Sequence, residues 1–505
     1  MTLCGILRTI WVGPLQGDRG LLFNSLQYLV FLPAVFVLFW LMPHKWRVPL
    51  LLVASYIFYM SWKPIYGLLI FGLTLGNFLM VPRIAKSIEE KHKKIWLGIV
   101  VAANLITLGV FKYASFAADT FKDTVNLFGM HVKDPHLHIL LPLGISFFVF
   151  EFIHYAVEVY RGKPEVKKFM DFALFASFFP TQIAGPIKRY MDFIPQLDIP
   201  AKFKWEYLDE GMHLILMGLT KKVIIADNLA LVVQAGFSHP ENFSSIDLWL
   251  ITYAFAFQIF FDFSGYTDIA RGSALLFGYK VPINFNLPYL AANIADFWRR
   301  WHISLSTWLR DYLFISLGGS RVGKWLNLRN LFITMALGGL WHGAGMHYLV
   351  WGAYQGILLI LHKQYSEALQ KAGLAEKLMK SKLYHVASIV VTFHAVCIGW
   401  VIFRADNMNI TWEMITKLAQ APVALLSFSA AQLQVLQIRD PIIFPALIVI
   451  LPTLMIAHVV VDWLNDKKIY KSPPWALQVG MMVAMMCLLT IFSPDTSPRF
   501  IYFQF

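Results

Sequence analysis

The chain has 505 residues, of which 58% are hydrophobic and only 14% are charged, whereas soluble domains usually carry about a quarter charged residues. This balance excludes an ordinary water-soluble enzyme and predicts an integral membrane protein, because apolar runs recur along the whole chain with only short polar breaks. The formal net charge of +13 comes from Lys and Arg clustered in those breaks, which is typical of cytoplasmic loops facing anionic lipid and not of a nucleic-acid-binding surface.

The apolar runs predict an all-α membrane protein with roughly 11 spanning helices, since about 20 residues of helix cross the hydrocarbon. They lie near residues 26–42, 48–62, 66–82, 95–112, 138–160, 211–235, 247–262, 331–362, 385–403, 441–462 and 475–493. We therefore expect one membrane domain over residues 21–505, preceded by an N-terminal extension over residues 1–20.

Three segments interrupt this pattern and predict re-entrant structure, near residues 170–190, 264–320 and 331–362. The second is too polar to face lipid and too apolar for a free loop, so we expect short helices that dip into the domain. The third is too long for one crossing and carries the glycine-rich elbow Gly338–Gly345 near its centre. Irregular backbone at membrane depth is tolerated only inside protein or beside a water-filled cavity.

His342 is the sharpest catalytic candidate among the 15 histidines. It sits in the glycine-rich elbow of an apolar run, and an ionisable group in such a run is expensive. Near neutral pH an imidazole can take a proton from a hydroxyl and return it to a leaving group. The alternative is a core histidine that bonds a neighbouring helix, and position alone does not separate the two.

His302 follows a cluster of charged residues, Asp296, Arg299 and Arg300. On a single short helix, Arg299 and His302 would share one face with Asp296 one turn earlier. A carboxylate that orients an imidazole, beside guanidinium groups that bind phosphate, would suit a nucleotide-bearing donor such as coenzyme A. The alternative is a salt-bridged anchor at the membrane surface with tryptophans in the aromatic belt.

The C-terminal tail, residues 495–505, ends in four aromatic side chains within Phe500–Phe505. If this tail threads back into the membrane domain, the Tyr502 hydroxyl could approach the elbow that holds His342, with the imidazole as the base that a phenol requires. The alternative is that the tail fills a hydrophobic groove. No metal site is predicted, because the three cysteines are scattered and His131, His136 and His138 have no fixed frame.

Several blocks together resemble the membrane-bound O-acyltransferase family, and within it the bacterial branch that contains the membrane subunit of alginate O-acetylation. The blocks are Leu22–Ser25, Pro180–Ile187, Phe261–Gly272, Phe297–Ser306, Gly339–Gly343, Phe403–Asp406 and Phe500–Phe505. They are distributed over nearly the whole chain, with only the first twenty residues outside them.

The resemblance implies a curved wall of helices around a thin layer pierced by a central tunnel. By analogy, His342 would be the essential catalytic histidine and His302 the second characteristic one. Asp296, Arg299, Arg300 and Trp341 would line the site of the donor, acetyl-CoA, and no cofactor would be permanently bound. Related systems use a C-terminal tyrosine motif as a transient acyl carrier, which makes Tyr502 a candidate.

We therefore expect an O-acetyltransferase of the bacterial inner (cytoplasmic) membrane. Its acetyl group would pass to an exported periplasmic O-acetyltransferase of the esterase-like type, which decorates a polysaccharide such as alginate. Membrane lipid would surround the protein, and no nucleic acid would bind. Two alternatives within the family are D-alanyl transfer to teichoic acid and peptidoglycan O-acetylation, and a transporter or lipid scramblase is the alternative from another class.

Overall fold

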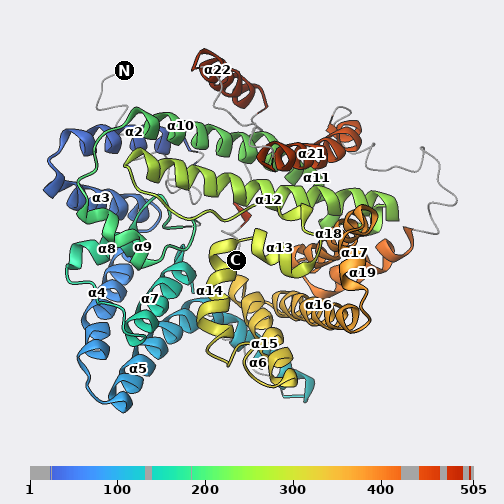
Figure 1. Ribbon diagram of the computed structural model, residues 1–505, viewed down its shortest axis with the longest axis horizontal. Helices are drawn as coiled ribbons and strands as arrows, with labels where there is room; N and C mark the ends of the chain where they lie inside the picture. Colours follow the sequence, from blue (N-terminus) through green and yellow to red (C-terminus); the bar gives the residue numbers. More distant parts are fainter. Residues whose placement is uncertain are drawn as a thin grey trace. The chain divides into compact units, whose positions relative to one another are not determined.

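The computed structural model describes residues 23, 25–130, 139–183, 185–421, 443–466, 475–492 and 500–501. All regular structure within these residues is helical, as predicted (Figure 1). Five helical segments among them are long and apolar enough to cross a membrane: Ile65–Lys86, Glu90–Leu127, Ser245–Leu276, Lys382–Arg404 and Leu447–Leu464. Each overlaps a predicted apolar run, while the total of roughly 11 spans stays a prediction.

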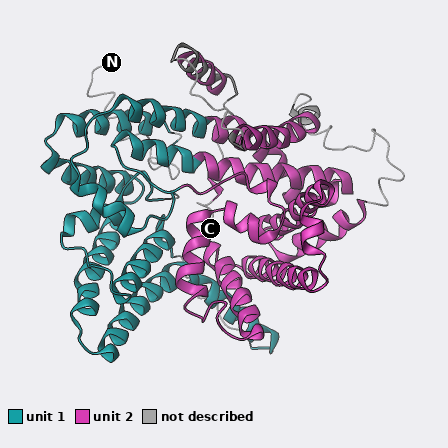
Figure 2. Ribbon diagram, in the orientation of Figure 1, with its two compact units in different colours: residues 1–219, 266–282 teal, residues 220–265, 283–505 magenta. Residues whose placement is uncertain are grey.

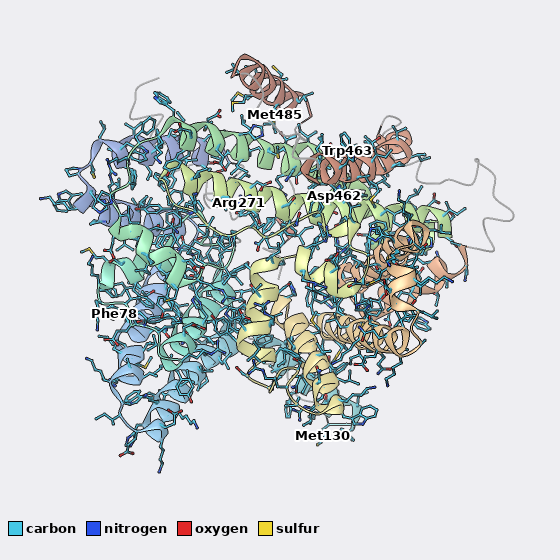
Figure 3. All side chains as sticks on the ribbon, in the orientation of Figure 1. Phe78, Met130, Arg271, Asp462, Trp463 and Met485 are labelled. Carbon is cyan, nitrogen blue, oxygen red and sulfur yellow. The ribbon has the colours of Figure 1, made fainter. Side chains whose placement is uncertain are left out.

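The chain forms two compact units, which Figure 2 distinguishes by colour. Unit 1 comprises residues 1–219 and 266–282, and unit 2 comprises residues 220–265 and 283–505. The long helix α12, Ser245–Leu276, carries residues of both units. In its last part Asp268 pairs with Arg271 at 3.5 Å, and Figure 3 labels that arginine on the ribbon of α12.

Unit 1 is built around the packing of α4, α5 and α7 and of α3 against α8. Its helices are α2 Leu26–Leu41, α3 His44–Met60, α4 Ile65–Lys86, α5 Glu90–Leu108, α6 Ala114–Leu127, α7 Ile145–Tyr160, α8 Phe169–Ser177, α9 Tyr190–Asp198 and α10 Trp205–Leu219, with a π-helical turn at Gly109–Tyr113. Between α4 and α5 the buried amides of Asn77 and Asn104 exchange hydrogen bonds of 2.8 and 3.2 Å. Such pairs join apolar helices where the hydrophobic effect cannot.

Helix α7 is shorter than the apolar run predicted at residues 138–160. It begins only at Ile145, because Gly144 at its N-terminus adopts a left-handed conformation with φ of 71°. Its 16 residues span about 24 Å, and most of their side chains are buried in unit 1. This segment is therefore a core helix of unit 1 rather than one that faces lipid.

Unit 2 contains the remaining helices. They are α11 Asp227–Ser238, the first part of α12, α13 Ile294–Arg300, α14 Ile303–Trp308, α15 Lys324–His342, α16 Met346–Lys371, α17 Ala375–Met379, α18 Lys382–Arg404, α19 Met408–Ala419, α21 Ile443–Asp466 and α22 Trp475–Phe492. Two π-helical segments, Thr220–Ala226 and Leu309–Phe314, and short 3₁₀ turns at Pro240–Asn242 and Pro288–Leu290 complete it. Asp462 and Trp463 mark the C-terminal end of α21 in Figure 3.

The segment predicted to be re-entrant near residues 264–320 begins within α12, which continues to Leu276, and its re-entry stays a prediction. Its uncharged polar residues on α12, Ser264, Thr267 and Ser273, are at most 3% exposed. They therefore face protein. The short helices expected in this segment are present further along, as α13 and α14.

Helices α15 and α16 form a close-packed hairpin, and the chain turns at Gly343–Gly345 between them. A Cβ atom added at Gly339 would lie 2.3 Å from the carbonyl oxygen of Tyr348. One added at Gly352 would lie 2.4 Å from the carbonyl oxygen of Met335. Only glycine allows the two backbones to approach this closely, and the approach fixes His342 at the end of α15.

Candidate functional site

His302 lies at the corner between α13 and α14, not on the face of one continuous helix. Helix α13 ends at Arg300, and His302 occupies the position before α14 in a left-handed conformation, with φ of 41°. Only His302 and Leu287 among the non-glycine residues described have a positive φ. The expected alignment of His302 with Asp296 and Arg299 is therefore wrong, because the helix breaks before it reaches the histidine.

The corner is held by the segment that precedes α13. The buried Asn284 accepts hydrogen bonds through Oδ1 from the backbone N–H of Ser304 at 3.2 Å and from its hydroxyl at 2.6 Å. The backbone N–H of Ile303 bonds the Asn284 carbonyl at 3.0 Å, and that of Asn286 bonds the Arg300 carbonyl at 2.9 Å. A left-handed histidine costs about 1–3 kcal/mol, and these bonds on both sides of it hold the strained conformation in place.

The His302 side chain is fully buried, at 0% exposure. Its ring meets the edge of Phe263 on α12, with the ring centres 4.7 Å apart, and it lies 6.3 Å from the ring of Trp341. Burial lowers the pKa of His302 from 6.5 to about 3, because the charged form loses its hydration. The imidazole is therefore neutral at physiological pH.

His342 ends α15 inside an aromatic enclosure and is 4% exposed. Its ring lies 5.0 Å from Trp341, 5.2 Å from Trp351 and 5.4 Å from Phe403, and the last two present their rings nearly at right angles to it. The side chain therefore points into protein. The prediction that this histidine is internal is correct.

Trp341 lies near both His302 and His342, which were predicted as separate candidates. Its ring is in contact range of His302 from the α13–α14 corner and of His342 beside it in α15. The same cluster continues from His302 through Phe263 to Phe500, whose ring lies 5.9 Å from that of Phe263. Four distant segments of sequence thus meet at one buried place in unit 2.

Three buried tryptophans border this place. Trp351 and Trp400 stack with ring centres 6.0 Å apart, and Trp298 lies 5.9 Å from Trp351. None of their Nε1 atoms has an acceptor among the residues the structure describes. A buried donor without an acceptor is costly, so the Trp351 N–H, on a ring 5.2 Å from His342, is suited to bind a polar atom of a substrate.

The charged residues of α13 lie outside the buried cluster. Arg300 Nε pairs with Asp296 Oδ2 at 2.9 Å, and both side chains are about a quarter exposed. Arg299 is exposed and bonds the backbone carbonyl of Ala295 at 3.2 Å. No carboxylate among the described residues forms an ion pair with Arg299. The same helix buries Trp298 against Trp351, so α13 connects this charged surface to the histidine cluster.

A cavity of about 840 Å³ opens beside the first residues of α13. It is bordered mainly by apolar side chains of α16 and α18, with His362 and His385 among its polar residues. Neither His302 nor His342 lines it, so we do not assign it to the reaction.

Unit 2 also contains a buried ion cluster that was not among the predicted site residues. Lys222 Nζ lies 2.6 Å from Asp227 Oδ1 and 2.7 Å from Asp262 Oδ1, and all three residues are at most 3% exposed. The other oxygen of Asp262 accepts the backbone N–H of Ile501 at 2.8 Å. Lys222, like His342, is an ionisable residue in an apolar run, where such a group is expensive. This signal in the sequence could have identified Lys222. Tyr502 lies outside the described residues.

Unit 1 has a buried ion pair of its own, in the segment near residues 170–190 that was predicted to be re-entrant. Lys188 Nζ lies 2.8 Å from Glu151 Oε1 and donates a hydrogen bond of 2.7 Å to the Thr181 hydroxyl. Lys188 and Glu151 are both nearly inaccessible. The pair fixes this segment against α7.

The fold and the site together define an all-helical, multi-pass membrane protein with a buried histidine centre. Its sequence matches the model of the membrane-bound O-acyltransferase family over residues 84–402. The chain belongs to this family and is an acyltransferase, which removes the transporter and scramblase alternative.

The chain is also similar to several curated proteins. The probable alginate O-acetylase AlgI of Pseudomonas aeruginosa is 40% identical over 458 residues, which cover 90% of this chain and 83% of the relative. The peptidoglycan O-acetyltransferase of Helicobacter pylori is 36% identical over 77% of this chain and 78% of its own length. The teichoic acid D-alanyltransferase of Bacillus subtilis is 34% identical over 54% of this chain and 71% of its own length.

Proposed function

We propose that this acyltransferase takes an acetyl group from acetyl-CoA on the cytoplasmic side of the bacterial inner membrane. It passes the group across the membrane for O-acetylation of a polysaccharide such as alginate. The observation that carries the proposal is the meeting of His302 and His342 at Trp341 in a buried aromatic cluster. The 40% identity to a probable alginate O-acetylase over 90% of the chain supports both the acetyl group and the acceptor.

In this proposal His342 is the general base. Its imidazole takes the proton of the acceptor hydroxyl while the hydroxyl oxygen attacks the thioester carbonyl carbon. The carbon–sulfur bond then breaks, and the imidazolium returns the proton to the departing thiolate. The products are an O-acetyl ester and free coenzyme A, and His342 ends in its starting state. A central tunnel from both sides of the membrane would bring donor and acceptor to this ring.

His302 and the tryptophans donate hydrogen bonds to the thioester carbonyl oxygen, on which negative charge develops. A neutral imidazole carries one N–H donor, and burial keeps His302 neutral. The Trp351 N–H has no acceptor among the described residues and belongs to a ring 5.2 Å from His342. Preorganised donors of this kind act strongly where water is excluded.

Arg299 and Arg300 bind the phosphates of the donor at the cytoplasmic surface. A guanidinium group suits phosphate because it offers several N–H donors in a fixed plane. Asp296 already holds Arg300 at 2.9 Å, so it sets the direction of that side chain. Trp341 completes the donor site next to the histidines. Because α13 reaches from this surface to the tryptophan cluster, one element positions both ends of the donor.

Tyr502 is the first acceptor in this scheme. It follows directly on Ile501, which is anchored by Asp262 in the part of unit 2 that contains His302. An acetylated tyrosine would then deliver the group to an exported, esterase-like periplasmic O-acetyltransferase. That partner would select the polysaccharide.

The test uses purified full-length protein and acetyl-CoA labelled in its acetyl group. His342→Ala should reduce the release of coenzyme A and the labelling of the C-terminal peptide by roughly a hundredfold or more. His458→Ala is the matched control, because His458 is also a buried histidine of unit 2, with Nδ1 bonded to the Leu454 carbonyl at 2.9 Å. Equal activity of the two variants would end the proposal. An unlabelled tail in an active protein would remove Tyr502 alone.

D-Alanyl transfer and peptidoglycan O-acetylation are the alternatives, and the relatives that carry those names support them less. The D-alanyltransferase similarity covers 54% of this chain, against 90% for the alginate O-acetylase. A side-by-side assay with acetyl-CoA and a D-alanyl-loaded carrier protein separates the donors. Turnover with the carrier protein alone would replace acetyl-CoA in the scheme.

A further inference from the structure

The buried ion cluster of unit 2 ends on the C-terminal segment of the chain. Asp262 uses one carboxylate oxygen for Lys222 at 2.7 Å and the other for the backbone N–H of Ile501 at 2.8 Å. Ile501 is 6% exposed and the neighbouring Phe500 is 2% exposed. The two described residues of the tail are therefore packed inside unit 2.

Local structure places Lys222 for this contact. It lies in the π-helical segment Thr220–Ala226, between α10 and α11, and α22 packs on that segment. A π-helical turn costs stability and recurs at functional sites. Asp227 at the start of α11 gives Lys222 its second carboxylate, at 2.6 Å.

Stability alone does not account for such a cluster. Desolvation of buried charges offsets most of their attraction, and apolar replacements are often as stable. A buried charge whose hydrogen bond points in one direction does fix the position of the group that it binds. Here the direction is toward the backbone of Ile501.

The tail and the histidine site share α12. Phe263, the residue after Asp262, packs with both Phe500 and His302, at ring distances of 5.9 and 4.7 Å. Adjacent side chains of one helix thus hold the tail and pack the strained histidine.

We propose that Asp262, oriented by Lys222, is a positioning residue that holds the backbone of Ile501 at the histidine cluster during acyl transfer. The catalytic consequence of this inference rests on the proposed function. The anchoring of Ile501 by Asp262 does not depend on that function. Asp262 touches neither donor nor acceptor hydroxyl in this scheme. It acts by fixing the backbone of Ile501.

The test separates anchoring from the general effect of a lost buried charge. Asp262→Ala and Asp227→Ala each remove one carboxylate from Lys222, but only the first removes the acceptor of the Ile501 N–H. Each is made in full-length protein carrying Ile501→Cys, with the three native cysteines replaced by alanine. Labelling by N-ethylmaleimide reports exposure of the tail.

We expect labelling to accelerate roughly tenfold or more in Asp262→Ala, as for a segment released from its contacts, and to change little in Asp227→Ala. With acetyl-CoA, Asp262→Ala should lower kcat roughly tenfold or more with little change in KM, because donor binding is untouched. Equal labelling in the two variants overturns the anchor. Faster labelling with normal kcat overturns the positioning role.

A second pair of variants covers the case in which Asp262→Ala does not fold. Phe263→Cys with Phe500→Cys in the cysteine-free protein should be joined by a short bifunctional maleimide, because the two native rings lie 5.9 Å apart and the spacer bridges thiols that are near but not in bonding distance. Peptide mapping detects the crosslink, and its absence overturns the packing of Phe500 on α12. Failure of the proposed function looks different. Activity that survives His342→Ala would remove the catalytic scheme, while the labelling contrast would still stand.

Discussion

Gly352→Ala tests whether the close approach of α15 and α16 positions His342. The added Cβ would lie 2.4 Å from the Met335 carbonyl oxygen and 3.0 Å from the Cα atoms of Ala336 and Gly339. All three are backbone atoms, so no side chain can rotate away. The two helices themselves have to separate.

The size of the separation follows from these distances. Ordinary contact begins at 3.4 Å, so the backbones must move apart by about 1 Å. Overpacking of this kind costs about 1–3 kcal/mol, and the better helix propensity of alanine offsets up to about 1 kcal/mol. Because His342 ends α15, its ring moves with the helix. A displacement of about 1 Å at reacting atoms lowers the rate on the order of a hundredfold.

The assay is His342-dependent release of coenzyme A from acetyl-CoA, with thermal unfolding measured in parallel. Gly72→Ala on α4 is the matched control, since a Cβ there meets nothing within 4 Å. We expect Gly352→Ala to lose most of its activity while remaining folded, and Gly72→Ala to keep it. If both variants are equally active, the glycine contact does not position the histidine.

Three further predictions concern the site. Arg299→Ala should raise KM for acetyl-CoA roughly tenfold, and Arg300→Ala less, because its charge is already paired; initial rates against acetyl-CoA concentration decide, and equal effects contradict the assignment. Trp351→Phe keeps the ring but removes the N–H, so kcat should fall roughly tenfold or more in the same assay; an unchanged kcat excludes the donor role. Burial lowers the pKa of His302 from 6.5 to about 3, so below about pH 6.5 His302 is protonated in the unfolded chain but not in the folded chain. Stability should therefore fall as pH drops, by up to about 1.4 kcal/mol per unit, and His302→Gln should flatten that slope in thermal unfolding between about pH 5 and about 7.

The class of protein and the identity of His342 as a buried residue could be predicted from the sequence. Hydropathy is a property of contiguous residues, so the apolar runs that became α4, α12 and α18 were visible without any tertiary information. The glycine-rich elbow was visible for the same reason. A histidine in such a run is either paired or functional, and it is buried in both cases.

The environment of His302 could not be predicted in this way. Helical spacing placed it beside Arg299, but hydrogen bonds that Ser304 donates to Asn284 Oδ1 stabilise a corner there instead. A left-handed histidine is strained on its own. Only contacts from a segment about twenty residues away make it the favoured conformation, and spacing arguments do not include such contacts.

The sequence by itself determined that the chain is a helical membrane protein. Exposing polar backbone and charge to lipid is unfavourable, and each apolar run must satisfy this constraint within its own residues. Only the tertiary structure decided which polar residues meet. Asp262 and Ile501 are 239 positions apart, and His302 reaches Trp341 from a different helix. Such pairs arise from the packing of whole helices, in which each position depends on all the others, so no local pattern specifies them.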